Sequence, residues 1–225
     1  MYSLKRSILS RLCGAGMLLA SHQALATSIQ TLGAGSAVTS ADLSANFNSL
    51  NEGDNVGAYT EGGLSVTTPT VVYLSFDPFN GAGDGSAFFY PWGGVNNAWV
   101  TIKTNSLDLM YGVEFLYGNG WTSDGPTFNW QTLDASNNVI SAGSYVGLAR
   151  GSIVGISDVG GFTTLQVAAN YSSSEIPPGF QAIALDNLRV QTNASASVPE
   201  TGATVALFGA VLLGLVGIRR KLAAS

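Results

Sequence analysis

Short apolar runs separated by turn-forming residues recur along the middle of the chain. The clearest run spans 107–116, and its alternate positions carry large apolar side chains: Leu107, Leu109, Tyr111, Val113 and Phe115. This period of two predicts a half-buried strand with one apolar face. Glu114 falls on the opposite face together with Asp108, so we expect its carboxylate to be exposed to solvent.

Nine further runs of this kind predict strands, at 70–75, 86–90, 98–103, 127–134, 138–141, 144–149, 152–156, 163–169 and 180–190. The segment 39–50 is ambiguous, and we interpret it as a strand that begins near Ala45. Strands at this spacing predict an all-β domain of two packed antiparallel sheets, a β-sandwich, over 27–190. The apolar parity of the last run switches at Asp186 and Asn187, which predicts a β-bulge there.

Residues 1–26 carry the pattern of a secretory signal peptide. A basic region is made by three cations: Lys5, Arg6 and Arg11. A short apolar core follows at 12–20. Ala24 and Ala26 supply the small residues that signal peptidase reads, so we expect the mature domain to begin at Thr27.

The other end of the chain carries a second apolar segment. Residues 203–218 have no charge, and three cations follow them: Arg219, Arg220 and Lys221. An uncharged run can enter lipid, whereas adjacent cations stay on the cytoplasmic side. We therefore expect a membrane helix at 203–218, a cytoplasmic tail at 219–225 and a body outside the inner membrane. At about 1.5 Å per residue the run spans roughly 24 Å, less than a bilayer core of about 30 Å, which suits a temporary anchor.

A five-residue motif precedes the membrane segment: Val198, Pro199, Glu200, Thr201 and Gly202. The motif, the Gly-containing apolar run and the basic end resemble the PEP-CTERM sorting signal of Gram-negative bacteria, and the likeness covers 198–221. This resemblance implies that an exosortase, a membrane-embedded protease, cuts near the motif and releases the protein or transfers it to the cell surface. The small polar segment 191–197 suits a flexible spacer within reach of that protease.

Two alternatives to an exosortase signal remain open. Thr201 and Gly202 are also similar to the Pro-x-Thr-Gly signal of Gram-positive sortases, which would make the chain a sortase-anchored cell-wall protein. That signal usually begins with Leu where this chain has Val198, and its substrates often carry Pro-rich or Lys-rich spacers that are missing here. The other alternative is an ordinary tail anchor.

The expected domain contains neither cysteine nor histidine, because Cys13 and His22 both fall within the signal peptide. This excludes disulfides, Ser-His-Asp and Cys-His catalysis, and most zinc, copper and iron sites. Between 27 and 197, thirteen carboxylates face three cations, Lys103, Arg150 and Arg189, for a net charge of −10. Such a surface repels nucleic acid and anionic lipid, so we expect neither as a partner of the folded domain.

A second resemblance covers most of the domain. Segments at 47–50, 59–64, 154–157 and 183–188 are similar, in this order, to jelly-roll domains that look like carbohydrate-binding modules and often precede PEP-CTERM signals. The resemblance implies a jelly-roll sandwich in which a calcium ion links the first and last strands. Asp186 stands at the late ligand position, but Asn48 replaces the early acid. The alternative is that Asp186 only shapes a bulge through side-chain to backbone bonds. We expect no other cofactor.

Saccharide binding needs flat aromatic platforms with hydrogen-bonding groups beside them. Tyr90 and Trp92 lie in one Gly-rich and Asn-rich loop and Trp121 lies in another, so these residues are the candidate platforms. A glycosidase is the enzyme class that two carboxylates alone would support, with Glu114 as the most suggestive acid. No spacing marks a carboxylate pair, and we expect no catalytic residue.

Together these patterns predict an exported cell-surface or extracellular-matrix protein that is held briefly in the inner membrane and then processed. The resemblance implies association with exopolysaccharide or biofilm material through the jelly-roll domain. A carbohydrate-active hydrolase and a sortase-anchored wall protein are the alternative functions.

Overall fold

The computed structural model describes residues 28–49, 56–75, 88–91, 98–118, 126–171, 180–181 and 183–194. Every helix or strand within these ranges is a β-strand, as expected for an all-β domain. The signal peptide, the sorting motif and the segment 203–218 lie outside them. Within them, no helix is long and apolar enough to cross a membrane.

Thirteen strands follow one another along the described part of the chain: β1 (Ile29–Leu32), β2 (Leu43–Ala45), β3 (Val56–Glu61), β4 (Leu64–Ser75), β5 (Phe88–Pro91), β6 (Val100–Thr104), β7 (Met110–Gly118), β8 (Thr127–Leu133), β9 (Val139–Val146), β10 (Ile153–Phe162), β11 (Thr164–Tyr171), β12 (Phe180–Gln181) and β13 (Ala184–Gln191).

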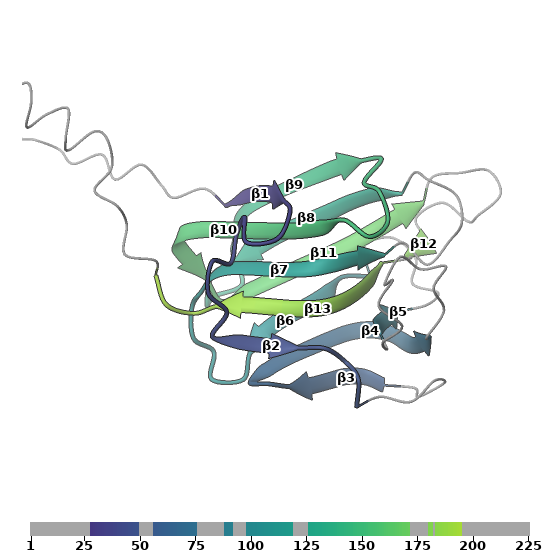
Figure 1. Cartoon of the computed structure of the whole chain (residues 1–225), viewed down its shortest axis with the longest axis horizontal. Coiled ribbons are helices and arrows are strands. Elements are labelled where there is room, and N and C mark those ends of the chain that lie inside the picture. The colour runs from purple at the N-terminus through teal and green to yellow at the C-terminus, as the bar shows by residue number, and fades with distance from the viewer. Residues whose placement is uncertain are drawn as a thin grey trace, which may run out of the picture.

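The strands form two antiparallel sheets that pack face to face. One sheet has the order β1-β10-β7-β13, with β2 also on β13. The other has the order β4-β6-β11-β8-β9, with β3 on β4 and β12 on β11. In Figure 1, β10, β7 and β13 lie in front of β11 and β6. The short strand β5 pairs with β4 and meets β13 at one residue pair, so the hydrogen-bond ladder continues from one sheet into the other.

The core fills the space between the two sheets. Alternate residues of β7 point into it, and Val113, Phe115 and Tyr117 are at most 1% exposed. The Phe115 and Tyr117 rings lie 6.2 and 5.6 Å from the ring of Phe128 on β8, in the opposite sheet. Contacts of this kind give the sandwich its stability, because the domain has no disulfides.

Side chains join the two sheets at the edge opposite β5. The Ser28 hydroxyl bonds to Thr132 on β8 and to Asp158 on β10, at 2.7 Å each. The indole N–H of Trp130 donates to Gln30 on β1 at 2.7 Å. Strands β1 and β8 are therefore linked across the layers by buried and half-buried polar contacts.

The predicted bulge in the last strand is confirmed. The register between β13 and β7 shifts between Asp186 and Arg189, and Asn187 adopts a positive φ of 49°. The Asp186 carboxylate accepts the backbone N–H of Asn187 at 2.6 Å, which holds the chain in this conformation. The parity switch in the sequence arises because the extra residue lets Leu185 and Leu188 both face the core.

Four strand predictions are wrong in detail. The segment 39–50 holds β2, which ends at Ala45 and does not begin there. The run at 180–190 forms two strands, β12 and β13, because β12 pairs with β11 while β13 pairs with β7. The strand predicted at 107–116 begins at Met110, because Leu107 lies in a turn with φ of 62° and is 65% exposed. The runs at 138–141 and 144–149 form the single strand β9. A Cβ on Gly143 would come within 2.7 Å of the Trp130 ring, so this glycine makes room for an aromatic neighbour and does not end the strand.

Candidate functional site

The outer face of the β10-β7-β13 sheet carries a buried acid paired with a half-exposed base. Glu114 on β7 lies directly opposite Arg189 on β13 in the strand register. The Arg189 Nη1 donates to the Glu114 Oε2 at 3.1 Å. The Glu114 side chain is 1% exposed and the Arg189 side chain is 38% exposed. The prediction that Glu114 is exposed is therefore wrong, although its parity was read correctly.

Burial of Glu114 comes from the segment between β1 and β2, which folds over the outer face of β7. The carboxylate accepts backbone N–H groups of Gly35 at 3.1 Å, Ala37 at 2.7 Å and Val38 at 3.1 Å. A Cβ on Gly112 would lie 2.1 Å from the Ala37 carbonyl oxygen, so the absent side chain lets this segment lie flat on the strand. Nothing in a strand pattern alone signals such a cover.

These contacts keep Glu114 ionised. Burial raises the pKa of the carboxyl group, but the N–H groups of Ala37, Val38 and Gly35 and the charge of Arg189 outweigh it, so the net pKa is lowered. A glycosidase acid needs a raised pKa so that it can hold a proton at neutral pH. Glu114 has the opposite property, and its oxygens are occupied by structural bonds.

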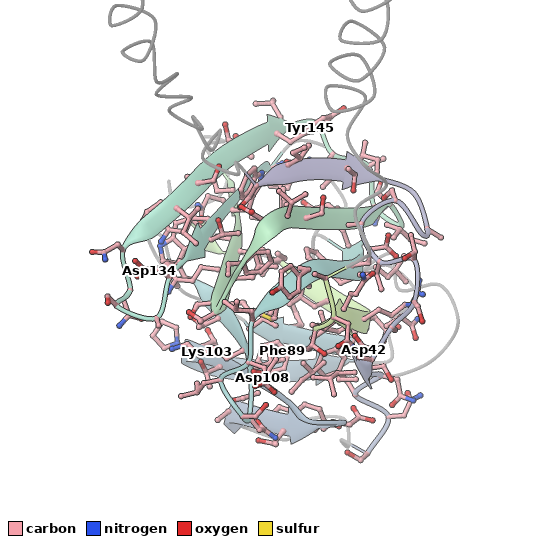
Figure 2. All side chains as sticks on the ribbon, turned by 90° about the vertical axis from the view of Figure 1, so that its left-hand side faces the viewer. Asp42, Phe89, Lys103, Asp108, Asp134 and Tyr145 are labelled. Atoms are coloured by element: carbon pink, nitrogen blue, oxygen red, sulfur yellow. The ribbon has the colours of Figure 1, made fainter. Side chains whose placement is uncertain are left out.

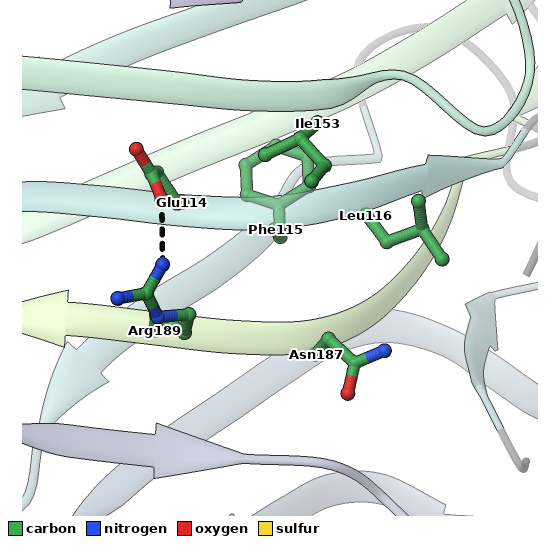
Figure 3. Close-up of a pocket in the computed structure, with 6 residues that line it drawn as sticks. All are labelled: Glu114, Phe115, Leu116, Ile153, Asn187 and Arg189. Atoms are coloured by element: carbon green, nitrogen blue, oxygen red, sulfur yellow. Dashed lines mark hydrogen bonds and ion pairs between the residues drawn. The ribbon is translucent and has the colours of Figure 1, made fainter. Parts of the chain in front are cut away.

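A pocket of about 270 Å³ opens beside this pair (Figure 3). Among the described residues, six line it: Glu114, Phe115, Leu116, Ile153, Asn187 and Arg189. Leu116 and Ile153 are half-buried and provide apolar surface, while Asn187 is exposed at the bulge. Within the part of the chain that the structure describes, Arg189 has Glu114 as its one acceptor, so further guanidinium N–H groups remain for a ligand. The pocket therefore combines an apolar surface with hydrogen-bond donors.

The predicted calcium residues occupy neighbouring parts of the fold. Asp186 is fully buried at the bulge and accepts the Asn187 side-chain amide at 3.2 Å in addition to its backbone N–H. Asn48 lies in the turn after β2, the strand that pairs with β13. Among the described residues, no group of three or more Asp, Glu, His or Cys side chains could hold a metal ion. Calcium binding stays a prediction.

The two segments that begin the jelly-roll resemblance meet in space. Tyr59 and Glu61 lie on β3, and Gly62 and Gly63 turn the chain into β4, both with positive φ. The Glu61 carboxylate accepts the backbone N–H groups of Asn46 and Phe47, at 3.0 and 2.9 Å. The Phe47 ring lies 5.2 Å from the Tyr59 ring. This cluster joins the β3-β4 hairpin to the end of β2, which the sequence order did not reveal.

The predicted saccharide platforms fall in two groups. Trp92 and Trp121 lie outside the described residues, so their role stays a prediction. Tyr90 on β5 is 4% exposed and packs 6.2 Å from the Phe88 ring. Stacking of a sugar on Tyr90 would require its surroundings to open.

Comparison with solved structures gives distant likenesses. A DUF4465 family protein from Bacteroides caccae is 9% identical, with a TM-score of 0.42, over 68% of this chain and 100% of that chain. A glycoside hydrolase family 43 arabinoxylan arabinofuranohydrolase from Bacillus subtilis, solved in complex with cellotetraose, is 10% identical with a TM-score of 0.31. It is matched over 66% of this chain and 30% of its own. At these TM-scores neither likeness carries an inference about activity, and neither supports the predicted resemblance to carbohydrate-binding modules.

Comparison with protein families identifies the C-terminal signal, whereas no curated protein matches the chain. The VPDSG-CTERM motif matches residues 197–222. Its name spells Val-Pro-Asp-Ser-Gly, so Glu200 stands in place of Asp and Thr201 in place of Ser. The chain thus carries a PEP-CTERM-like sorting signal, which implies export and processing by an exosortase-type system and favours this reading over the sortase alternative.

Proposed function

We propose that this chain is an exported surface or matrix protein whose β-sandwich binds polysaccharide at the pocket beside Glu114 and Arg189. The C-terminal signal accounts for its delivery to the envelope. The pocket on the outer face of the sheet supports a binding role. It places apolar surface beside guanidinium N–H groups of Arg189 that Glu114 does not use. Binding without catalysis is the role, because Glu114, the carboxylate among the described residues of the pocket, is held ionised by backbone N–H groups.

The chemistry of the pocket suits a sugar ring. Pyranose C–H faces pack on apolar side chains such as Leu116 and Ile153, while hydroxyl oxygens accept from Arg189 and Asn187. The net charge of −10 over 27–197 opposes the approach of a polyanion. A neutral polysaccharide is therefore the favoured ligand class.

Two substitutions test the pocket with little change to the backbone. Asn187→Gly removes the amide at a position whose positive φ glycine adopts easily, and Arg189→Lys keeps the charge but loses the planar donor fork. Each variant should bind neutral glycans about tenfold more weakly, the effect of about 1.4 kcal/mol, as measured by titration calorimetry. Asn137→Gly is the matched control, because Asn137 also has a positive φ of 63° but lies in the turn before β9.

The same titrations decide between the alternatives. If the protein binds acidic glycans and no neutral ones, the ligand class is an acidic polysaccharide. If both pocket variants bind as tightly as the unmodified protein, the pocket is not the binding site. Release of oligosaccharides from the bound glycan would instead support a hydrolase.

A further inference from the structure

Asp42 holds the two residues that directly follow β13, near the end of the described chain. Its carboxylate accepts the backbone N–H groups of Thr192 at 2.8 Å and Asn193 at 3.1 Å. It also accepts the Thr192 hydroxyl at 3.2 Å and the Asn193 side-chain amide at 3.0 Å. The backbone N–H of Asp42 donates to the Val190 carbonyl at 2.9 Å. One side chain thus holds the two residues that follow β13.

Neighbouring hydrogen bonds also hold the residues that follow β13. The Gln191 amide donates to the Asn193 carbonyl at 2.9 Å, and the Thr39 hydroxyl donates to Gln191 at 3.3 Å. Hydrogen bonds from the Thr192 and Asn193 N–H groups lower the pKa of the Asp42 carboxyl group, so it is ionised at neutral pH. Segments from both ends of the described chain therefore meet at Asn193.

The two residues held by Asp42 lie close to the sorting signal in the sequence. Four residues, Ala194 to Ser197, separate Asn193 from the first motif residue Val198. A fully extended chain covers at most about 3.6 Å per residue, so these four residues reach about 14 Å. A protease that reads the motif must therefore work beside the folded sandwich.

We propose that Asp42 is a positioning residue for C-terminal processing: its clamp on Thr192 and Asn193 sets the length of chain available to the protease. This inference rests on the proposed processing of the signal. Loss of the clamp frees two residues and adds about 7 Å of reach. The signal then moves further from the bulk of the domain, and cutting becomes faster.

Pulse-chase labelling in the cells that make the protein measures this effect as the rate at which the C-terminal tail is lost. Asp42→Ala should raise the rate about twofold or more, because a spacer that barely spans the distance to the protease gives a low effective concentration, and two freed residues lengthen it. Asp42→Asn keeps one acceptor oxygen and should give a smaller increase. Insertion of two residues into 194–197 should have the same effect as Asp42→Ala.

The decisive variant combines Asp42→Ala with deletion of two residues from 194–197. It should return the rate to that of the unmodified protein, which a purely structural defect would not do. Asp134→Ala is the matched control. Asp134 is half-buried, its carboxylate accepts two backbone N–H groups within its own turn, and it lies on the opposite side of the molecule from Asp42 in Figure 2. Its loss should leave the rate unchanged.

Two outcomes would overturn the clamp, and they differ from failure of the proposed function. If the unmodified protein is processed while Asp42→Ala and the insertion leave the rate unchanged, spacer length does not control processing. If Asp42→Ala slows processing and the deletion does not correct it, Asp42 acts only in folding. If the unmodified protein is never cut, the proposed sorting is itself wrong.

Discussion

Three carboxylates of this domain bind backbone N–H groups of segments distant in the sequence. Glu114 holds the chain between β1 and β2, Glu61 holds the residues after β2, and Asp42 holds the residues after β13. Each replaces a contact that a helix cap or a disulfide supplies in other small domains. Acidic residues in this chain are therefore used for architecture as well as for surface charge.

Substitution of Glu114 by Gln tests this role at the residue scale. The variant should lose about 2 kcal/mol of unfolding free energy at pH 7, because the amide accepts fewer hydrogen bonds and leaves buried N–H groups unpaired. Urea unfolding monitored by tryptophan fluorescence measures the difference.

The pH dependence of that difference follows from the lowered pKa of Glu114. A carboxyl group with a lowered pKa in the fold stabilises it above the unfolded pKa of about 4.3, and this stability is lost as pH falls through the folded value. Unfolding curves of the protein and of Glu114→Gln should therefore converge as the pH falls below about 4.3. A gap that stays constant over this range would show that the charge of Glu114 contributes nothing.

At the scale of elements, the segment 33–38 can pack on β7 because Gly112 has no side chain. Gly112→Ala places a Cβ 2.1 Å from the Ala37 carbonyl, and backbone at that distance must move. We expect a loss of about 2 kcal/mol or more by thermal unfolding, in the range of overpacked cores.

A second strand glycine provides the control for that substitution. A Cβ on Gly57 of β3 would meet its nearest atom, the Thr68 carbonyl oxygen, at 3.8 Å, which is ordinary contact. Gly57→Ala should therefore be neutral or slightly stabilising. Equal losses of stability in Gly112→Ala and Gly57→Ala would contradict the close packing of the segment 33–38 on β7.

Elements with strong alternation were predictable from the sequence, and elements defined by tertiary contacts were not. The strand of Val113 and Phe115 and the bulge at Asn187 leave a pattern of period two or a break in it. Strand β1 was not predicted, and its apolar residues Ile29 and Leu32 are exposed at the sheet edge, so no alternation towards a core marks it. Burial of Glu114 depends on a loop that meets it from 77 residues away in the sequence, which no local pattern records.

The candidate site divides in the same way. The sorting signal was predictable because its chemistry is contiguous: a short motif, an uncharged run and a basic end. The pocket was not, because its lining comes from β7, β10 and β13 and becomes a site through strand register alone. Arg189 stood out in the sequence as one of three cations in the domain, but its partner became evident only in the fold.

The whole molecule combines an acidic sandwich with a C-terminal address. Carboxylates outnumber cations by ten between 27 and 197, while the basic residues gather at the two ends of the chain. This separation suits a chain whose ends interact with a membrane and whose body remains outside it.

Export and C-terminal processing can be tested together by intact-mass measurement of the native protein, recovered from the cell envelope and the growth medium. We predict a polypeptide that begins at or near Thr27 and has lost the basic tail after a cut close to the motif at 198–202. Recovery from the cytosol of a polypeptide that still contains both Met1 and Ser225 would contradict this prediction.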